Sequence, residues 1–307
     1  MLSLARVALL VGLACCPAAR AQTVATTNPD QAASQATVLK LNAYVGLLNR
    51  TLRASESLSR YSSWVNMKTG PTGRERIIYG LYSLNDARGE IEKAKAATTM
   101  DPAMPDLDAE VGTYIAAYEA LAPAIIQADG YYDRQDYRTD KMVEGKALHV
   151  KLAAAGQVFL AERAKIEPLF AREKSRSDAA ELASIETREG RKARWHSANV
   201  MIRARQVVDL LPRENRPVID MTSFNAALAA FAASVKDMDQ YSAANPDSFS
   251  SFESQPRSFL GKLREFQEKL TRAGSDARRG GASDLTWIVN DYNMMVSTSR
   301  IPVRSPR

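Results

Sequence analysis

The chain has 307 residues, of which 45% are hydrophobic and 25% are charged. These proportions are ordinary for a globular protein and exclude a chain that is disordered throughout. The formal net charge of +6 is not gathered into a dense stripe of lysine and arginine, so we predict no nucleic-acid partner. The only cysteines, Cys15 and Cys16, leave the rest of the chain without a disulfide framework or a thiolate metal site.

Residues 1–21 have the pattern of a signal peptide. Arg6 precedes an apolar run that is too short to span a bilayer as a helix. The sequence Ala19-Arg20-Ala21 has the A-x-A form of a signal peptidase site, so cleavage is predicted to leave Gln22 as the first residue. The alternative is a lipoprotein signal, because Leu13-Ala14-Cys15-Cys16 resembles a lipobox. Both interpretations predict a periplasmic or secreted protein, with membrane contact only through a lipid on its N-terminus.

The pattern after the export signal predicts helices. Residues 22–37 are polar and are predicted to form a flexible leader, while residues 301–307 are predicted to be a disordered tail. Between them we predict a helical domain over residues 38–300. From Val38 to about Met67, apolar residues recur every three or four positions, as on one face of a helix. Glycines and a proline then interrupt the pattern, and a second helix is predicted over residues 74–97.

The same periodicity continues to the end of the chain. Asp129-Gly130 is predicted to end the third helix, and Pro168 is predicted to kink or break the fourth. Further helices are predicted over residues 177–211, 224–238, 256–270 and 283–296. No segment shows sustained alternation with a period of two. The predicted fold is all-α, an antiparallel bundle of long helices, and the pattern also allows two similar halves that share the long helix 177–211.

The stretch from Asp129 to Leu152 carries residues that packing alone does not require. Tyrosines offer flat apolar faces and a hydroxyl, which suit sugars or peptides. The alternative is an aromatic plug at a corner of the bundle. A glycine in mid-helix, Gly145, is destabilising relative to alanine and predicts the close approach of another backbone near the tyrosines. The candidate binding surface consists of Tyr131, Tyr132, Asp133, Asp136, Tyr137, Asp140, Gly145 and His149.

The aspartates and histidines of the chain do not favour a metal site. Asp133, Asp136 and Asp140 lack the spacing of an EF-hand loop, and acidic residues are common at a helix N-terminus. The only histidines, His149 and His196, are not at the i, i+4 spacing of a helical zinc site. We therefore predict no catalytic residue, no metal and no cofactor.

The sequence resembles a known family at three places. They are the central residues Tyr131-Tyr132, Tyr137, Asp140, Gly145 and Leu148-His149, the opening Leu41-Asn42-Ala43-Tyr44-Val45, and the closing Asp291-Tyr292-Asn293. Together they resemble the YiiG-like proteins, a bacterial envelope family of unknown function, over about Val38 to Arg300. The resemblance implies an all-helical secreted protein or lipoprotein, and it carries over no catalytic residue.

These observations favour a non-enzymatic protein that binds or scaffolds in the cell envelope. Its partner is predicted to be another envelope protein or a cell-wall component. The alternative is a hydrolase or lyase acting on cell-wall polymer, with Asp133, Asp136 or Asp140 as acid and base. A third hypothesis, an accessory of metal uptake, is disfavoured because the two histidines are far apart.

Overall fold

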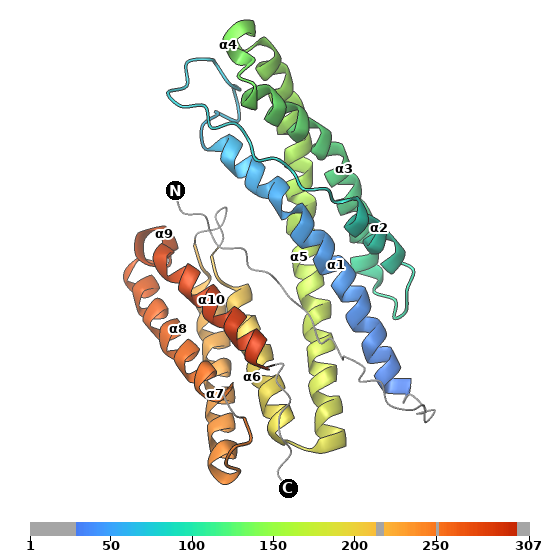
Figure 1. Ribbon diagram of the computed structural model, residues 1–307, viewed down its shortest axis with the longest axis vertical. Helices are drawn as coiled ribbons and strands as arrows, with labels where there is room; N and C mark the ends of the chain where they lie inside the picture. Colours follow the sequence, from blue (N-terminus) through green and yellow to red (C-terminus); the bar gives the residue numbers. More distant parts are fainter. Residues whose placement is uncertain (1–28, 213–217, 250–251, 300–307) are drawn as a thin grey trace. The chain divides into compact units, whose positions relative to one another are not determined.

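A computed structural model of the chain describes residues 29–212, 218–249 and 252–299 (Figure 1). These residues form ten helices, and the only β-type pairing among them is an isolated bridge between Val218 and Asp276. The predicted all-α class is therefore confirmed. The predicted export signal and the predicted tail lie outside the described residues. The first helix begins at Pro29, within the predicted leader and before Val38.

The described chain divides into two compact units, with the boundary between Ser177 and Asp178. The N-terminal unit contains α1 (Pro29–Ser62), α2 (Arg88–Ala97), α3 (Pro105–Asp133), α4 (Tyr137–Asp140) and most of α5 (Val143–Glu189). Helix α1 packs against α2 and α3. Helix α5 meets α3 at Phe159, whose ring lies 5.4 Å from that of Tyr114 and 6.1 Å from that of Tyr118.

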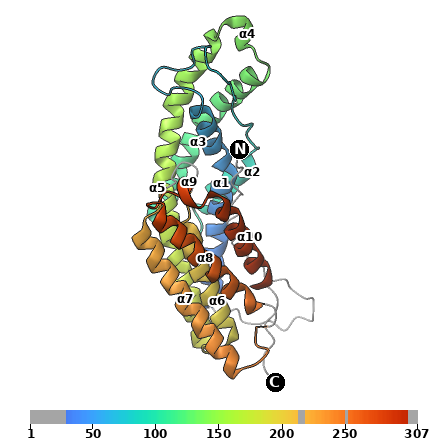
Figure 2. The same ribbon diagram turned by 90° about the vertical axis from the view of Figure 1, so that its left-hand side faces the viewer.

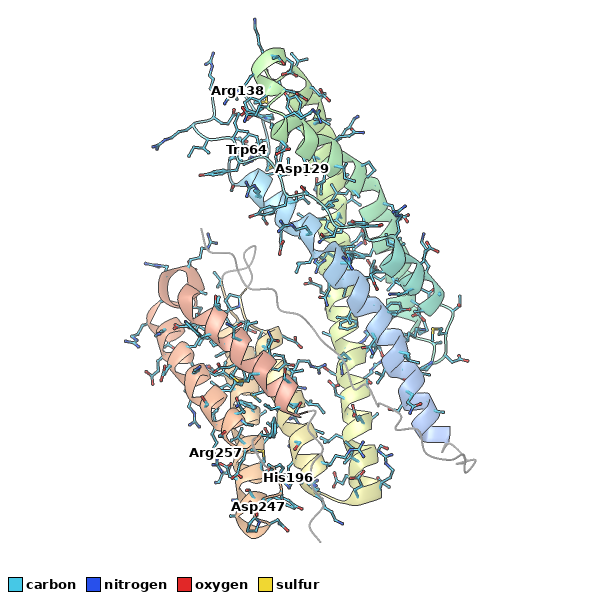
Figure 3. All side chains as sticks on the ribbon, viewed as in Figure 1. Trp64, Asp129, Arg138, His196, Asp247 and Arg257 are labelled. Carbon is cyan, nitrogen blue, oxygen red and sulfur yellow. The ribbon has the colours of Figure 1, made fainter. Side chains whose placement is uncertain are left out.

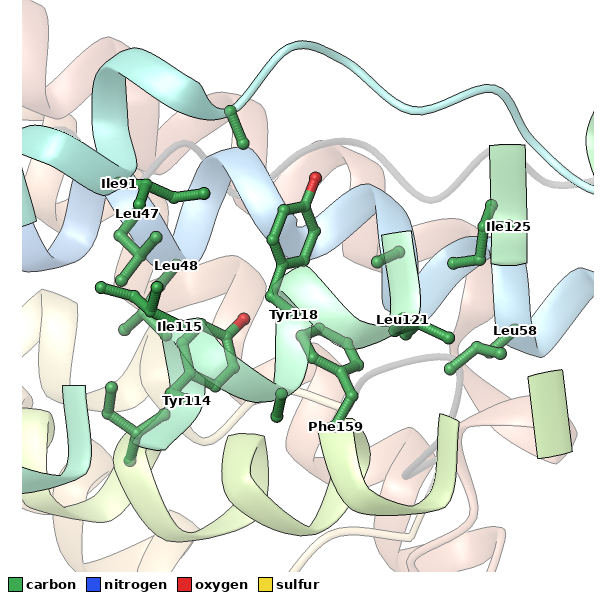
Figure 4. Close-up of a cluster of buried hydrophobic side chains, with 14 of the residues drawn as sticks. Leu47, Leu48, Leu58, Ile91, Tyr114, Ile115, Tyr118, Leu121, Ile125 and Phe159 are labelled. Carbon is green, nitrogen blue, oxygen red and sulfur yellow. The ribbon is translucent and has the colours of Figure 1, made fainter. Parts of the chain in front are cut away.

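The core of the N-terminal unit combines aliphatic side chains with tyrosines (Figure 4). The residues labelled there are Leu47, Leu48 and Leu58 of α1, Ile91 of α2, Tyr114, Ile115, Tyr118, Leu121 and Ile125 of α3, and Phe159 of α5. A buried hydroxyl without a partner is destabilising. The hydroxyl of Tyr114 avoids this because it bonds Thr51 and accepts from the guanidinium of Arg163 at 2.9 Å.

The C-terminal unit is built around four long helices. It contains the end of α5, then α6 (Ala193–Asp209), α7 (Met221–Ala244), α8 (Ser254–Arg272), α9 (Ala277–Gly280) and α10 (Ala282–Ser299) (Figures 1 and 2). Helix α6 packs against α7 and α10, and α8 packs against the same two helices. Their apolar faces enclose a second core rich in phenylalanine. At its edge the buried guanidinium of Arg205 forms an ion pair with Asp178.

The prediction of one helix over residues 177–211 is wrong. Helix α5 ends at Glu189 because Gly190 adopts a φ of +75°, the left-handed conformation that closes many helices. A kink or a break was predicted at Pro168, and the break is wrong, since α5 continues through this residue. Pro168 and Ala164 are both exposed, so water can bond the carbonyl of Ala164 that loses its helical partner.

The predicted helix over residues 74–97 is wrong in its first half. Only α2 is helical there, and residues 63–87 form a loop. The Arg60 guanidinium of α1 donates twice to the carbonyl of Tyr79, at 2.9 and 2.6 Å. Gly80 has a φ of +66°, which no helix allows. Side chains of α1 therefore make hydrogen bonds to the backbone of residues that the periodicity had assigned to a helix.

A buried ion pair links α1 to the first turn of α3, and the same ammonium also bonds the loop between α2 and α3. Lys40 is fully buried, and its ammonium donates to Asp108 at 2.8 Å and to the carbonyls of Met100 and Pro102 at 2.8 and 3.1 Å. All three ammonium hydrogens therefore have acceptors. Asp108 also accepts from the hydroxyl of Tyr44. Burial and the Asp108 carboxylate raise the pKa of that hydroxyl above its usual range.

Replacing Lys40 by methionine is expected to lower the free energy of unfolding by about 3–5 kcal/mol, because Asp108 is left without its counter-charge. The matched control is Lys93→Met, since Lys93 pairs with Glu90 at 3.0 Å but is exposed. Lys93→Met should lower the free energy of unfolding by at most about 1 kcal/mol. Urea unfolding monitored by circular dichroism measures both, and equal losses in the two variants would contradict the importance of the buried pair.

Candidate functional site

The tyrosine-rich stretch lies at the end of the N-terminal unit that carries α4 and the loop 63–87 (Figures 1 and 2). We call this region the tyrosine end. The prediction that Asp129-Gly130 ends the third helix is wrong, because α3 continues to Asp133. Tyr131 and Tyr132 therefore occupy its last turn, where their side chains are buried in the core. This burial offsets the low helix propensity of the glycine.

Five aromatic side chains pack together at the tyrosine end. The ring of Tyr132 lies 4.9 Å from that of Tyr131 and 5.1 Å from that of Trp64, both edge to face. Trp64 in turn lies 5.4 Å from Tyr61 of α1. Tyr131 and Tyr132 are 0% and 5% exposed, whereas Tyr137 is half-buried and contacts both. Two of the three candidate tyrosines are thus part of an aromatic plug, and the third reaches solvent.

Gly145 is the point at which α5 passes this plug. A β-carbon there would lie 2.6 Å from the sulfur of Met142, 3.0 Å from Cε1 of Tyr131 and 3.1 Å from the hydroxyl oxygen of Tyr132. These separations are below van der Waals contact. The neighbours that require a glycine are therefore side chains, where the sequence predicted another backbone.

Asp140 connects the plug to the start of α5. Its carboxylate accepts from the hydroxyl of Tyr131 and from the backbone N–H groups of Met142 and Glu144, each at 2.8 Å. Partial burial raises the pKa of Asp140, but the bonds from Glu144, Tyr131 and Met142 outweigh it, so the pKa is lowered and the group is ionised. Burial and this carboxylate raise the pKa of the Tyr131 hydroxyl above its usual range.

The other two aspartates do not join Asp140 in a common site. Asp136 pairs with Arg134 at 2.7 Å, and Asp133 is exposed. Acid and base catalysis on one substrate requires two carboxyl groups directed at the same bond. The structure therefore gathers tyrosines, Asp140 and Gly145, but it does not bring the three carboxylates together.

His149 is buried and fastens the loop 63–87 onto α5. Its Nδ1 lies 3.2 Å from the hydroxyl of Tyr61, and its ring also bonds the backbone of Met67. A β-carbon on Gly70 would lie only 2.8 Å from the ring, so this loop residue rests directly on the imidazole. Burial lowers the pKa of His149, and the bond to the Met67 backbone opposes the shift. Burial also raises the pKa of Tyr61, to about 12.

Tyr61, Trp64 and the loop were not predicted from the sequence to be parts of this region. The indole N–H of Trp64 donates to the carbonyl of Gly80 at 3.0 Å, which holds the far side of the loop. The local signal that could have indicated this contact was the aromatic pair Tyr61 and Trp64, near the end of the first predicted helix. Its contact with residues near 130 depends on tertiary packing that no local pattern encodes.

Two further findings bear on chemistry. Across the described ranges, no group of three or more His, Cys, Asp or Glu side chains is placed to hold a metal ion. None of the helices within those ranges is long and apolar enough to cross a membrane.

Gly145→Ala is expected to lower the free energy of unfolding by about 1–3 kcal/mol, because the added methyl overpacks the plug. The matched control is Gly112→Ala in α3, where nothing lies within 4 Å of the new β-carbon. That change should raise stability by about 0.5–1 kcal/mol, since alanine is the better helix former. Thermal unfolding compares the two, and shifts of the same sign would contradict the packing described at Gly145.

The pKa of His149 is lower in the folded chain than its unfolded value of about 6.5. As the pH falls below that value, the unfolded chain takes up protons first, so the free energy of unfolding is expected to decrease. His149→Gln should flatten this decrease between neutral pH and about pH 5. His196, whose pKa is also lowered by burial, accounts for a remaining slope that His196→Gln removes. Urea unfolding at several pH values measures the slopes, and an unchanged slope in His149→Gln would contradict the assignment.

The chain is 27% identical to "Uncharacterized protein YiiG" of Escherichia coli (strain K12) in an alignment 305 positions long, which covers 91% of this chain and 84% of that protein. This confirms the resemblance to the YiiG-like proteins. No solved structure matches the chain. The family described as "Protein of unknown function (DUF3829)" matches residues 35–299, a range that includes residues of both units. The chain therefore belongs to the DUF3829 family.

Proposed function

We propose that this protein is exported and acts in the cell envelope as a non-enzymatic binding protein, with the tyrosine end as its binding surface. The pattern of residues 1–21 supports export to the periplasm or beyond, with a lipid on Cys15 or Cys16 as the alternative. The partner we propose is a cell-wall component or another envelope protein.

The observation that carries this proposal is the rigid construction of the tyrosine end. His149, Tyr131 and Tyr132 are buried and fix the loop 63–87 and α4 in place. A surface that is already ordered loses less conformational entropy when it binds. Tyr137 and Asp133 reach solvent beside this support and are available for contact, whereas the half-buried Asp136 and Asp140 are engaged by Arg134 and by the start of α5.

The hydrolase or lyase alternative draws its support from a different pair of residues. Burial, and then the neighbouring carboxyl of Glu162, raise the pKa of Glu110, while Lys165 lowers that of Glu162. Carboxyl groups whose pKa values diverge are typical of acid and base pairs. Lys165 bonds both oxygens of Glu162 at 2.9 Å, which favours an ion pair at the junction of α3 and α5 over a catalytic role.

The test is co-sedimentation of the protein with purified, lipid-free peptidoglycan. Tyr137→Ala is expected to reduce the bound fraction on the order of tenfold, because an aromatic contact residue carries a large share of binding energy. The matched control is Tyr241→Ala, another half-buried tyrosine that contacts two rings, those of His196 and Phe249. Binding that is equal in both variants, or absent in the wild type, would contradict a wall-binding tyrosine end.

The same preparation tests the alternative. Release of soluble fragments from peptidoglycan by the wild type, and its loss in Glu110→Gln, would replace the binding proposal with the hydrolase. We expect no release.

A further inference from the structure

The tyrosine end also carries exposed cations mixed with exposed apolar side chains. The cations are Lys68, Arg74 and Arg76 of the loop and Arg138 and Lys141 of the α4 region, and the apolar side chains are Met67, Ile77 and Val143. The three apolar side chains are 38%, 49% and 69% exposed. We call these eight residues the basic tip. Their exposure is notable because a folded chain gains free energy by burying such apolar side chains.

The cations of the basic tip have no carboxylate partner among the described residues. Elsewhere in the same unit, exposed cations are commonly paired, as Arg88 is with Asp86 at 2.7 Å. Near the tip, Glu75 instead accepts from the backbone N–H of Gly73 at 2.8 Å, which turns its charge toward the loop. Other carboxylates close in sequence are Asp140, which accepts from the first N–H groups of α5, and the exposed Asp133 and Glu144. The five cations of the tip are therefore only partly balanced.

The loop and the α4 region form one surface. A β-carbon on Gly73 would lie 3.7 Å from Cβ of Met142, the residue that follows Lys141. The loop therefore touches the turn between α4 and α5. Figure 3 shows Arg138 and Trp64 at this same end of the unit.

The conformation of the loop is fixed from within. The side-chain oxygen of Asn66 accepts from the backbone N–H of Lys68 at 2.9 Å, and that of Glu75 accepts from the hydroxyl of Thr72 at 2.9 Å. Below it, Gly70 rests on His149. The exposed side chains of the tip thus project from a backbone that is already ordered.

We propose that the basic tip docks on a membrane surface that bears anionic phospholipid headgroups. Lysine and arginine are attracted to such a surface, and exposed aliphatic side chains enter the boundary between headgroups and acyl chains. A soluble polyanion would use the cations but not Met67, Ile77 and Val143. The combination of both kinds of side chain on one surface is what selects the membrane.

This contact is separate from the lipid anchor considered for the N-terminus. The anchor would be covalent and would involve Cys15 or Cys16, whereas the tip binds through side chains of the folded unit. The inference goes beyond the proposed wall binding and does not depend on it, since vesicles and lipid-free peptidoglycan test the two separately.

The experiment is co-sedimentation of the full chain with vesicles of phosphatidylcholine alone and of phosphatidylcholine mixed with phosphatidylglycerol. The double variant Arg74→Glu, Arg76→Glu is expected to bind the anionic vesicles more weakly by on the order of tenfold or more. Binding of the wild type should also weaken as salt screens the charges. Any contribution from the apolar N-terminus is common to all variants and persists on the neutral vesicles.

The matched control is the double variant Lys236→Glu, Arg264→Glu in the C-terminal unit. Both residues are exposed and have no side-chain partner among the described residues, and the net charge changes by the same amount. This control should bind as the wild type does. An equal loss in the two double variants would show only a general attraction between charges and would overturn the proposal.

Ile77→Ser separates a membrane from a soluble anionic polymer. It is expected to weaken binding to anionic vesicles several-fold, because less apolar surface is buried. It should leave any binding of soluble polyphosphate unchanged. If Ile77→Ser binds vesicles like the wild type and polyphosphate displaces the protein from them, the tip recognises an anionic polymer and the membrane proposal fails.

Discussion

The tyrosine end depends on one close approach, the passage of α5 over the plug at Gly145. Any side chain there would overlap Met142, Tyr131 and Tyr132. Because α5 can lie this close, Asp140 reaches both the hydroxyl of Tyr131 and the first N–H groups of α5. The turn between α3 and α5 is thereby closed by hydrogen bonds and aromatic packing together.

This arrangement changes the role of the candidate residues. Tyr131, Tyr132 and His149 face inward, where each hydroxyl or ring nitrogen has a partner within the unit. They serve as supports for the loop 63–87, and the side chains that reach solvent belong to that loop and to the α4 region. The side chains available at this surface are therefore cations, aliphatic side chains, the exposed carboxylates of Asp133 and Glu144, and one half-buried tyrosine, Tyr137.

The fold class and most helices could be predicted because amphipathic periodicity is a local property. The errors have different physical causes. Pro168 did not break α5, because the carbonyl of Ala164, which loses its helical partner, is exposed to water. Residues 74–87 did not form a helix, because side chains of α1 such as Arg60 hold their backbone. The glycine at position 190 was a local signal for a helix end that the long apolar pattern obscured.

The sequence by itself determined the helical architecture, the family and the stretch around which the candidate site is built. It also indicated that Gly145 lies close to another segment, since a mid-helix glycine is unfavourable without such a reason. Only the tertiary structure decided which candidate residues are buried and which reach solvent, because burial depends on partners that are distant in the sequence. Tyr61, Trp64 and the loop 63–87 meet the tyrosines through such contacts alone. Of the two arrangements that the sequence allowed, an aromatic platform and an aromatic plug, the same contacts make Tyr131 and Tyr132 part of a plug that supports the loop.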